Sequence, residues 1–369
     1  MNSLNSSLNS SLLTQQLAHV IEAKSILNPI FLLVNLIGVL GNGIVLAIVR
    51  MKQQTDPSAV TVINIHLVSA WVVLDLIVLP VPVIINYLYD VGLRTGRGYC
   101  VYVVIMATLF SSARYWLEVA LAVNRCWALC APHYYSAIRR QHRRIATAMI
   151  AFAWTAATVF TVPYGLGLGG IFYTINNTNQ CVYKTTTAGG EFLTVLNLYL
   201  PNVIVGVCCL AILIKLRMVW RTDRQTVPAS GSAGSPAESQ PVSQRRQING
   251  QRRLNVAFVL FASYGWNLIC DVPYSVISRA YSHLVLRHRY LSSVLLLLYA
   301  LEFAMGPFTL LLVNREYWNI AKRQWPDIFC RNSGSTNDDP AEAVVCTNAI
   351  QRPPRTSLIV SHVEKHARS

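Results

Sequence analysis

Residues 100–130 read CVYVVIMATLFSSARYWLEVALAVNRCWALC and decide how the rest of the chain is interpreted. The stretch is longer than the about 20 apolar residues that a helix needs to cross a bilayer. It nevertheless carries Arg114, Glu118 and Arg125, whose spacing places all three on one helical face. Because charges inside a membrane helix are costly and usually face a protein interior, we predict that this helix is the centre of a bundle.

Apolar segments of crossing length recur along the chain. It has 369 residues, of which 53% are hydrophobic and only 13% charged, far from an average soluble protein. Seven such segments occupy residues 27–49, 59–86, 101–124, 146–168, 192–216, 255–280 and 290–313. They predict an all-α membrane protein, with a seven-helix domain at 27–326 between tails at 1–26 and 327–369.

The net charge of +15 is distributed unevenly. With the N-terminus outside, most of the 31 Lys and Arg residues fall on the cytosolic side, as expected from the positive-inside rule. We therefore interpret the charge as basic cytosolic loops and not as a nucleic-acid surface. Three glycosylation sequons, at Asn5, Asn9 and Asn176, fall outside in the same topology.

The nine cysteines divide by compartment. Cys100 and Cys181 fall outside the membrane on the oxidising side, which makes them the natural disulfide pair. Five others lie in or near the helices and are expected to be small core residues: Cys126, Cys130, Cys208, Cys209 and Cys270. No Cys or His spacing predicts a metal site, and no cofactor is expected.

Two cytosolic segments have distinct compositions. Residues 222–251 are rich in Ser, Pro, Gly and Gln, which predicts a flexible loop. Residues 314–325 place aromatic and aliphatic side chains opposite basic ones, which predicts an amphipathic helix on the inner membrane surface. Cys330, just beyond it, is a candidate for lipidation, and the tail from 327 is expected to be disordered.

Several landmarks carry a resemblance to a known family. They occur in order and at the family's spacing: Asn42, Pro80, Cys100 with Cys181, Arg125, Trp154, Pro201, Pro273 and Pro307. Over roughly residues 27–326 the chain resembles the rhodopsin-like G-protein-coupled receptors. The resemblance implies a multi-pass receptor of the plasma membrane, surrounded by lipid. It also implies an extracellular ligand, a heterotrimeric G protein as partner and arrestin as a further candidate.

The family's switch motifs are nearly all altered. Its Asp-Arg-Tyr reads Asn124-Arg125-Cys126, its helix 6 Trp position is Asp271, and its Asn-Pro-x-x-Tyr begins at Gly306 and ends at Leu310. The remaining departures are Trp71 at the helix 2 aspartate position, Cys209 at the helix 5 tyrosine and Asn267 at the helix 6 phenylalanine. The chain is therefore a divergent member, and the family's activation mechanism cannot be transferred whole.

The family's intramembrane sodium site has changed its chemistry. The aspartate and serine that hold the ion correspond to Trp71 and Arg114, so we predict that sodium does not bind. An unpaired buried charge costs several kcal/mol, so Arg114 needs partners. Those at suitable depth form a predicted polar core with Arg114: Glu118, Asn267, Asp271 and Glu302. The core either only locks the bundle or acts as a switch that responds to pH or ligand.

Arg125 has lost both of its usual restraints. The residue before it is Asn124, and the helix 6 position that often pairs with it is Arg253. One interpretation is a weakened inactive state with raised basal coupling. The other is poor coupling, because the tyrosines of helices 5 and 7 are also missing.

The ligand is only partly constrained. Ala107 stands where amine receptors carry aspartate, which argues against a biogenic amine, and residues 290–313 lack the Lys that a retinal Schiff base needs. Tyr274, Arg279 and Tyr281 lie near the predicted outer mouth. They suit an acidic lipid or an acidic peptide, or form ordinary solvated loop.

Other functional classes fit less well. A transporter would show inverted repeats or paired broken helices, and a membrane protease would show paired catalytic residues; the sequence shows neither, so no enzyme is predicted. The serious alternative is a seven-helix decoy or scaffolding receptor that does not signal.

Overall fold

The computed structural model describes residues 29–53, 59–81, 84, 97–137, 141–175, 180–225, 240–280, 289–313 and 317–322. The chain divides into two compact units, Met1–Tyr317 and Trp318–Ser369. The bundle described below belongs to the first unit.

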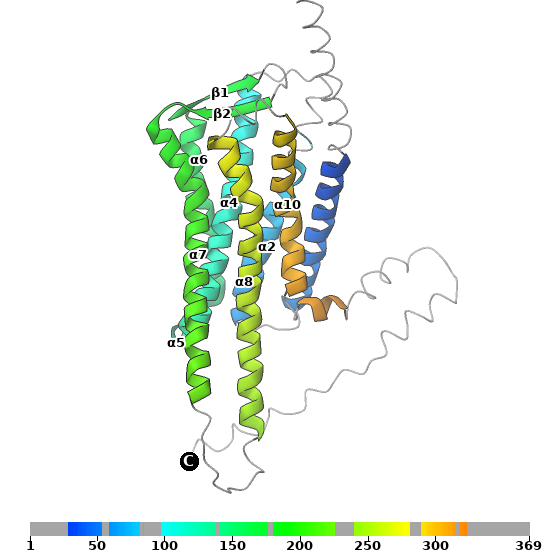
Figure 1. Cartoon of the computed structure of the whole chain (residues 1–369), viewed down its shortest axis with the longest axis vertical. Helices are drawn as coiled ribbons and strands as arrows, with labels where there is room; N and C mark the ends of the chain where they lie inside the picture. Colours follow the sequence, from blue (N-terminus) through cyan, green and yellow to red (C-terminus); the bar gives the residue numbers. More distant parts are fainter. Residues whose placement is uncertain are drawn as a thin grey trace, which may run out of the picture. The chain divides into compact units, whose positions relative to one another are not determined.

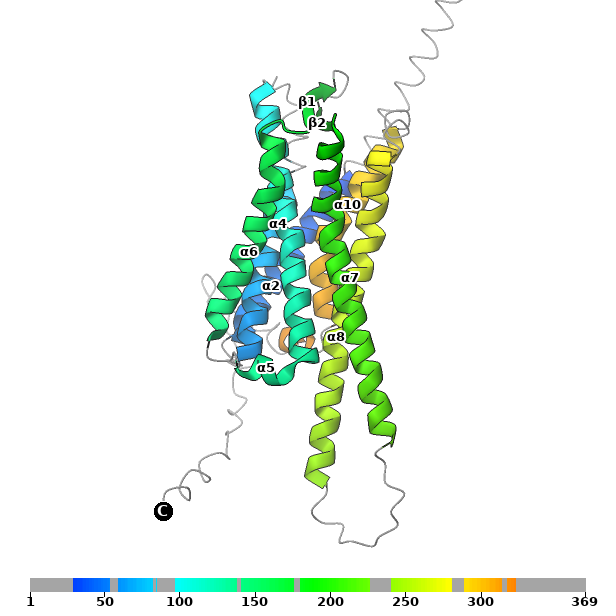
Figure 2. The same cartoon turned by 90° about the vertical axis from the view of Figure 1, so that its left-hand side faces the viewer.

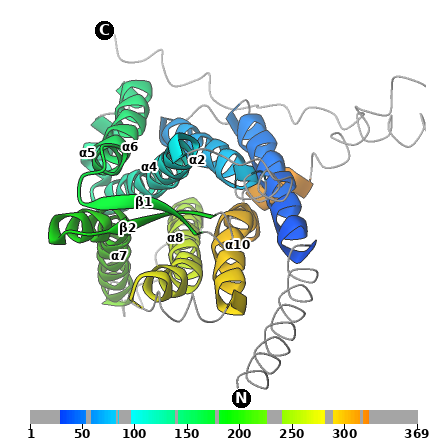
Figure 3. The same cartoon turned by 90° about the horizontal axis from the view of Figure 1, so that it is seen from above.

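Seven long helices make up this bundle, as the sequence predicted (Figure 1). They are a first helix at Pro29–Gln53, α2 (Ala59–Val78), α4 (Arg97–Cys130), α6 (His142–Gly165), α7 (Ala188–Gln225), α8 (Gln240–Ala280) and α10 (Arg289–Val313). The short α5 (Pro132–Ala137) follows α4 directly. Helix α4 contacts α2, α6, α7 and α8, which confirms its central place; the view along the bundle shows this (Figure 3).

Four of the described helical segments are long and apolar enough to cross a membrane. They are Pro29–Gln53, Val104–Cys130, His142–Pro163 and Ala188–Val219, and the apolar parts of α2 and α10, Val62–Val78 and Leu297–Leu312, are shorter. Aliphatic side chains on the outside of these helices, such as Leu36, Val159 and Val207, are more than half exposed. Apolar exposure on this scale is typical of a lipid-facing surface.

The helices α7 and α8 extend well beyond the predicted spans (Figure 2). Helix α7 continues to Gln225 and α8 begins at Gln240, so residues 222–225 and 240–251 of the predicted flexible loop are helical. Apolar periodicity ends with the bilayer, but Gln and Arg are good helix formers and extend a helix already nucleated inside it. Residues 226–239 lie outside the described part.

A β-hairpin follows α6, where the sequence predicted only a loop. Strands β1 (Gly170–Ile175) and β2 (Gln180–Thr185) pair antiparallel, with Thr174 opposite Cys181. Aromatic and β-branched residues on both strands favour this structure. Gly169, with φ of +86°, turns the chain into β1 and adopts a conformation that favours glycine. Both strands contact α4, and β2 also contacts α7.

The landmark residues of the first helix join it to α10. Asn42 is completely buried, and its Nδ2 donates to the backbone oxygens of Gly38 and Phe303 at 2.9 and 3.4 Å. A Cβ at Gly38 would lie 2.8 Å from Cβ of Ala304, so glycine allows this close approach. Beside it, Val78, Leu79, Phe303 and Ala304 form a buried apolar cluster.

The predicted surface helix is described only in part. Residues 317–322 are helical, and within them Lys322 Nζ lies 5.3 Å from the ring of Trp318. In the first unit, Lys52 Nζ lies 4.5 Å from the ring of Tyr317.

Candidate functional site

Arg114 is the largest completely buried side chain among the described residues. Its Nε lies 2.9 Å from Oδ1 of Asp75, and its Nη1 lies 2.5 Å from Oε1 of Glu302. Its Nη2 lies 3.1 Å from Oε1 of Glu118, an ion-pair distance at which the two groups are not aligned for a hydrogen bond. The acids come from α2, α10 and α4, so the guanidinium ties three helices together.

Asp75 is the partner that the sequence analysis missed. Counting by family positions puts the helix 2 acid at Trp71, and Asp75 lies four residues later, one turn along the same helical face. Asp75 is completely buried, and its Oδ1 accepts the hydrogen bond from Arg114. Helix 2 therefore still supplies a carboxylate, one turn beyond the family's position. The i,i+4 spacing of Trp71 and Asp75 is the feature of the sequence that could have predicted it.

Aromatic rings enclose the guanidinium. Cζ of Arg114 lies 4.4, 5.4 and 5.5 Å from the ring centroids of Phe303, Tyr115 and Trp71. At these distances the ring quadrupoles attract a cation, an effect that strengthens when water is excluded. The indole of Trp71 also lies against Gly306 of α10, where a side chain would collide with it.

Asp271 belongs to a second group of polar side chains and does not contact Arg114. Its Oδ1 accepts hydrogen bonds from Ser275 at 2.9 Å and Tyr115 at 3.3 Å, and its Oδ2 accepts one from Asn202 at 3.3 Å. The Tyr115 hydroxyl also lies 3.5 Å from Oε2 of Glu302. The predicted polar core thus consists of two groups, and Tyr115 lies between them.

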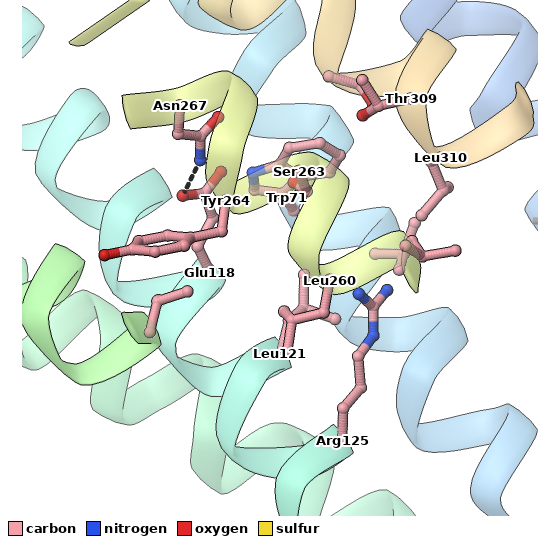
Figure 4. A pocket seen from close by; sticks show the side chains of 14 residues that line it. Trp71, Glu118, Leu121, Arg125, Leu260, Ser263, Tyr264, Asn267, Thr309 and Leu310 are labelled. Atoms are coloured by element: carbon pink, nitrogen blue, oxygen red, sulfur yellow. Dashed lines mark hydrogen bonds between the residues drawn. The ribbon is translucent and has the colours of Figure 1, made fainter. Parts of the chain in front are cut away.

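Asn267 joins the Arg114 cluster through Glu118. Its Nδ2 donates to Oε2 of Glu118 at 2.6 Å, so α8 is also connected to the cluster. Both residues line a cavity of about 30 Å³, which is also lined by Trp71, Ser263 and Arg125 (Figure 4). Figure 4 shows Glu118 and Asn267 at one end of this cavity and the Arg125 guanidinium at the other.

Near the C-terminal end of α4, Asn124 and Arg125 have different surroundings. Asn124 is buried; its Nδ2 donates to Oδ1 of Asn64, and its Oδ1 accepts from the Tyr135 hydroxyl, both at 3.0 Å. Within the described ranges, Arg125 has neither a hydrogen bond nor an ion pair; its side chain points toward Leu260 and Leu310. The Arg253 side chain lies outside the described part.

The family model for seven-transmembrane receptors of the rhodopsin family matches residues 41–309. The chain belongs to this family. The crystal structure of squid rhodopsin covers 88% of this chain and 91% of its own, with a TM-score of 0.62 and 15% identity, which shows a shared fold. No curated protein matches the sequence.

As a member of the rhodopsin family, the chain is a multi-pass G-protein-coupled receptor. Members of this family are generally not enzymes. Against that family, the altered positions have visible structural consequences. Cys209 and Leu310, at the two missing tyrosines, are both buried. Cys126 faces Cys130, with 3.9 Å between their sulfur atoms. Among the described side chains, no three of His, Cys, Asp or Glu are arranged to hold a metal ion.

Polar and aromatic side chains also meet between α4, α7, α8 and α10 of this rhodopsin-family bundle. Tyr274 packs against Tyr299 with 4.9 Å between ring centroids, and the Tyr299 hydroxyl lies 2.7 Å from Oγ of Ser111. Ala107 is half-buried on α4, and Ser112 donates to Asn197 of α7 at 2.6 Å. Tyr274 of α8 thus packs against Tyr299 of α10, which is hydrogen-bonded to Ser111 of α4.

Several predicted site residues of the receptor lie outside the described part. Cys100 is in α4 and Cys181 in β2, but their side chains are not described, so the disulfide stays a prediction. The same holds for the side chain of Arg279. Four further predicted sites fall outside the described ranges altogether: Asn5, Asn9, Asn176 and Cys330, together with the pocket candidate Tyr281.

Proposed function

We propose that the protein is a plasma-membrane receptor, N-terminus outside, that couples an extracellular ligand to heterotrimeric G proteins through Arg125. The observation that carries this proposal is the arrangement at the end of α4. Asn124 is engaged by Asn64 and Tyr135, and no described acid restrains Arg125. A guanidinium that is not locked in the resting receptor is available to a cytosolic partner, which supports raised basal coupling.

The Arg114 cluster has a separate role in this proposal. The guanidinium joins α4 to α2 and α10 through Asp75 and Glu302, where a sodium ion would otherwise provide the positive charge. Loss of a buried partner from such a cluster costs about 3–5 kcal/mol. These two ion pairs hold the helices together, and signal output depends on the cytosolic third of the bundle.

The ligand enters from the outer side, toward the network of Tyr274 and Tyr299. Ala107 offers no charge to a protonated amine, and α10 contains no Lys for a Schiff base, so neither a biogenic amine nor retinal is proposed. Arrestin is a further expected partner of the active receptor.

A non-signalling decoy or scaffolding receptor is the second candidate. The buried Cys209 and Leu310 favour it, because neither has the hydroxyl with which the family's tyrosines steady the open state. Its fold and ligand-binding half would be the same; only the cytosolic output would differ.

Basal signalling across the G-protein families separates the two candidates. Wild type and Arg125→Ala are compared at matched surface levels, with Arg143→Ala, an exposed cytosolic arginine of α6, as the control. A basal signal that Arg125→Ala abolishes and Arg143→Ala retains supports coupling through Arg125. Equal output from wild type and Arg125→Ala supports the decoy.

A further inference from the structure

Four acidic side chains lie near one guanidinium at the centre of the bundle, and three of them pair with it. Asp75 and Glu302 are 0% exposed, Asp271 is 2% exposed, and the side chain of Glu118 is 11% exposed. One guanidinium neutralises one carboxylate, and an uncompensated ionised carboxylate is very costly in a low-dielectric interior. Protons must therefore occupy part of this carboxyl cluster.

The four carboxyl groups differ in their access to solvent. Asp75 and Glu302 are held by Arg114 at 2.9 and 2.5 Å, and neither lines the cavity. Asp271 is surrounded by three neutral donors. Glu118 is the member of the cluster that lines the cavity, and its Oε1 is a buried atom without a hydrogen-bond partner.

A second buried atom points to water in the same cavity. Nε1 of Trp71 has no hydrogen-bond partner, although the residue is only 4% exposed and lines the cavity. The cavity of about 30 Å³ is lined mainly by apolar side chains and has room for about two water molecules, which need two or more polar partners each. The indole N–H and the Glu118 carboxylate supply such partners, and the cavity continues to Arg125 at the cytosolic end (Figure 4).

We propose that Glu118 is a proton-binding site that equilibrates with the cytosol through this cavity, so that the receptor responds to cytosolic pH. A proton from cytosolic water binds to Oε1 of Glu118, which becomes a neutral acid. The ion pair with Nη2 of Arg114 is lost, and the guanidinium stays bound to Asp75 and Glu302. Neutral Glu118 keeps its hydrogen bond from Asn267 on Oε2.

The groups that face Glu118 set the sign of this equilibrium. Arg114 on the same helix favours the ionised form, while Asp75 of α2 and Glu302 of α10 lie within electrostatic range and favour the neutral form. Helix α8 contributes Asn267 and Tyr264, which are uncharged. Arg125 of α4 lines the far end of the cavity. Helix α7 contributes the apolar Val205. Acidic cytosol therefore populates the neutral state of Glu118.

Infrared spectroscopy of the purified receptor in lipid nanodiscs tests the proton site, because a protonated carboxyl has its own C=O stretching band. We expect wild type to gain such a band as pH is lowered and Glu118→Gln not to gain it. Glu191→Gln makes the same chemical change at an exposed carboxyl of α7, away from the cluster, and retains it. An unchanged pH-dependent band in Glu118→Gln overturns the proposal.

Deuterium exchange of the same band tests the route. Ser263→Phe fills the cavity between Glu118 and Arg125 and slows exchange, whereas Ala107→Phe, which adds the same group in the outer half, leaves the rate unchanged. If only Ala107→Phe slows exchange, protons enter from outside and the proposal is wrong. Leu260→Trp replaces Ser263→Phe if the latter does not fold. Neither measurement needs ligand or G protein, so the result is independent of the proposed function.

Discussion

The indole of Trp71 fills the space that a side chain on residue 306 would need. An ideal Cβ on Gly306 would lie 2.8 Å from Cη2 and 3.1 Å from Cζ2 of Trp71. The family carries a small acid on helix 2 and asparagine on helix 7 at these positions. Here a large residue faces glycine, so the two departures are complementary in volume.

Gly306→Ala should therefore destabilise the receptor by about 1–3 kcal/mol, since overfilling a packed core has that cost. Gly43→Ala is the matched control, because a Cβ there meets nothing within 4 Å. It should be neutral or stabilising by up to about 1 kcal/mol, from helix propensity. Thermal unfolding of Trp71→Leu, Gly306→Ala and the double variant checks the coupling: strictly additive losses would show that the two residues do not interfere.

Arg114→Met should lower surface expression and stability, by about 3–5 kcal/mol, because it leaves several acids without their counter-charge. The loss should shrink as pH falls, since protonated carboxyls tolerate burial without a cation. Unfolding temperatures of wild type and variant, measured across a pH series, check both statements. A deficit that is small, or that grows on acidification, would argue against the cluster.

Asp75→Asn should be more damaging than Asp271→Asn, although both make the same chemical change. Asp75 pairs directly with Arg114, so its loss costs about 3 kcal/mol or more. Asp271 has neutral donors only, so its loss costs about 1 kcal/mol, the worth of ordinary hydrogen bonds. Side-by-side thermal unfolding gives the order, and a reversed order would mean that Asp271 is the true partner.

Replacing sodium by potassium at constant ionic strength should leave the unfolding temperature unchanged. The guanidinium of Arg114 already occupies the centre of the carboxylates and repels a second cation. Stabilisation specific to sodium, with a saturating dose dependence, would contradict this expectation.

Asn124→Asp should reduce basal signalling by restoring an acid beside Arg125. Tyr135 keeps a hydrogen-bond acceptor in this variant, whereas Oδ1 of Asn64 loses its donor, so the Asn64 amide has to turn and donate to the new carboxylate. Tyr135→Phe, which removes that hydroxyl and adds no charge, serves as the control. The signal is compared at matched surface levels, and equal basal output from Asn124→Asp and wild type would show that the missing acid is not what frees Arg125.

Sequence periodicity was sufficient for the helices and for part of the polar core. Glu118 follows from its i,i+4 relation to Arg114, and Glu302 from its matching depth. Depth does not determine the direction around a helix axis, however, so Asp271 was placed with Arg114, whereas it faces Asn202 of α7. The family's spacing does not predict Asp75, because it points to Trp71, one helical turn away on the same face.

A hydropathy pattern does not predict the β-hairpin at 170–185 or the helical extension at 240–251. The hairpin at 170–185 is short, and its alternation is weak beside the long apolar runs around it. The helical residues 240–251 carry no apolar stripe, so their helicity comes from propensity and from continuation of a helix formed inside the bilayer.

Helix α8 is long enough to amplify a small rotation at one end into a large displacement at the other. From Pro273 back to Gln240 the helix runs for about 50 Å at 1.5 Å per residue. A swing of about ten degrees at the proline, a natural hinge in a helix, would carry the far end through about 9 Å. A small displacement near Asp271 and Ser275 would thus become a large one at Gln240, and a cytosolic partner would contact the moving end of α8 and not the hinge at Pro273.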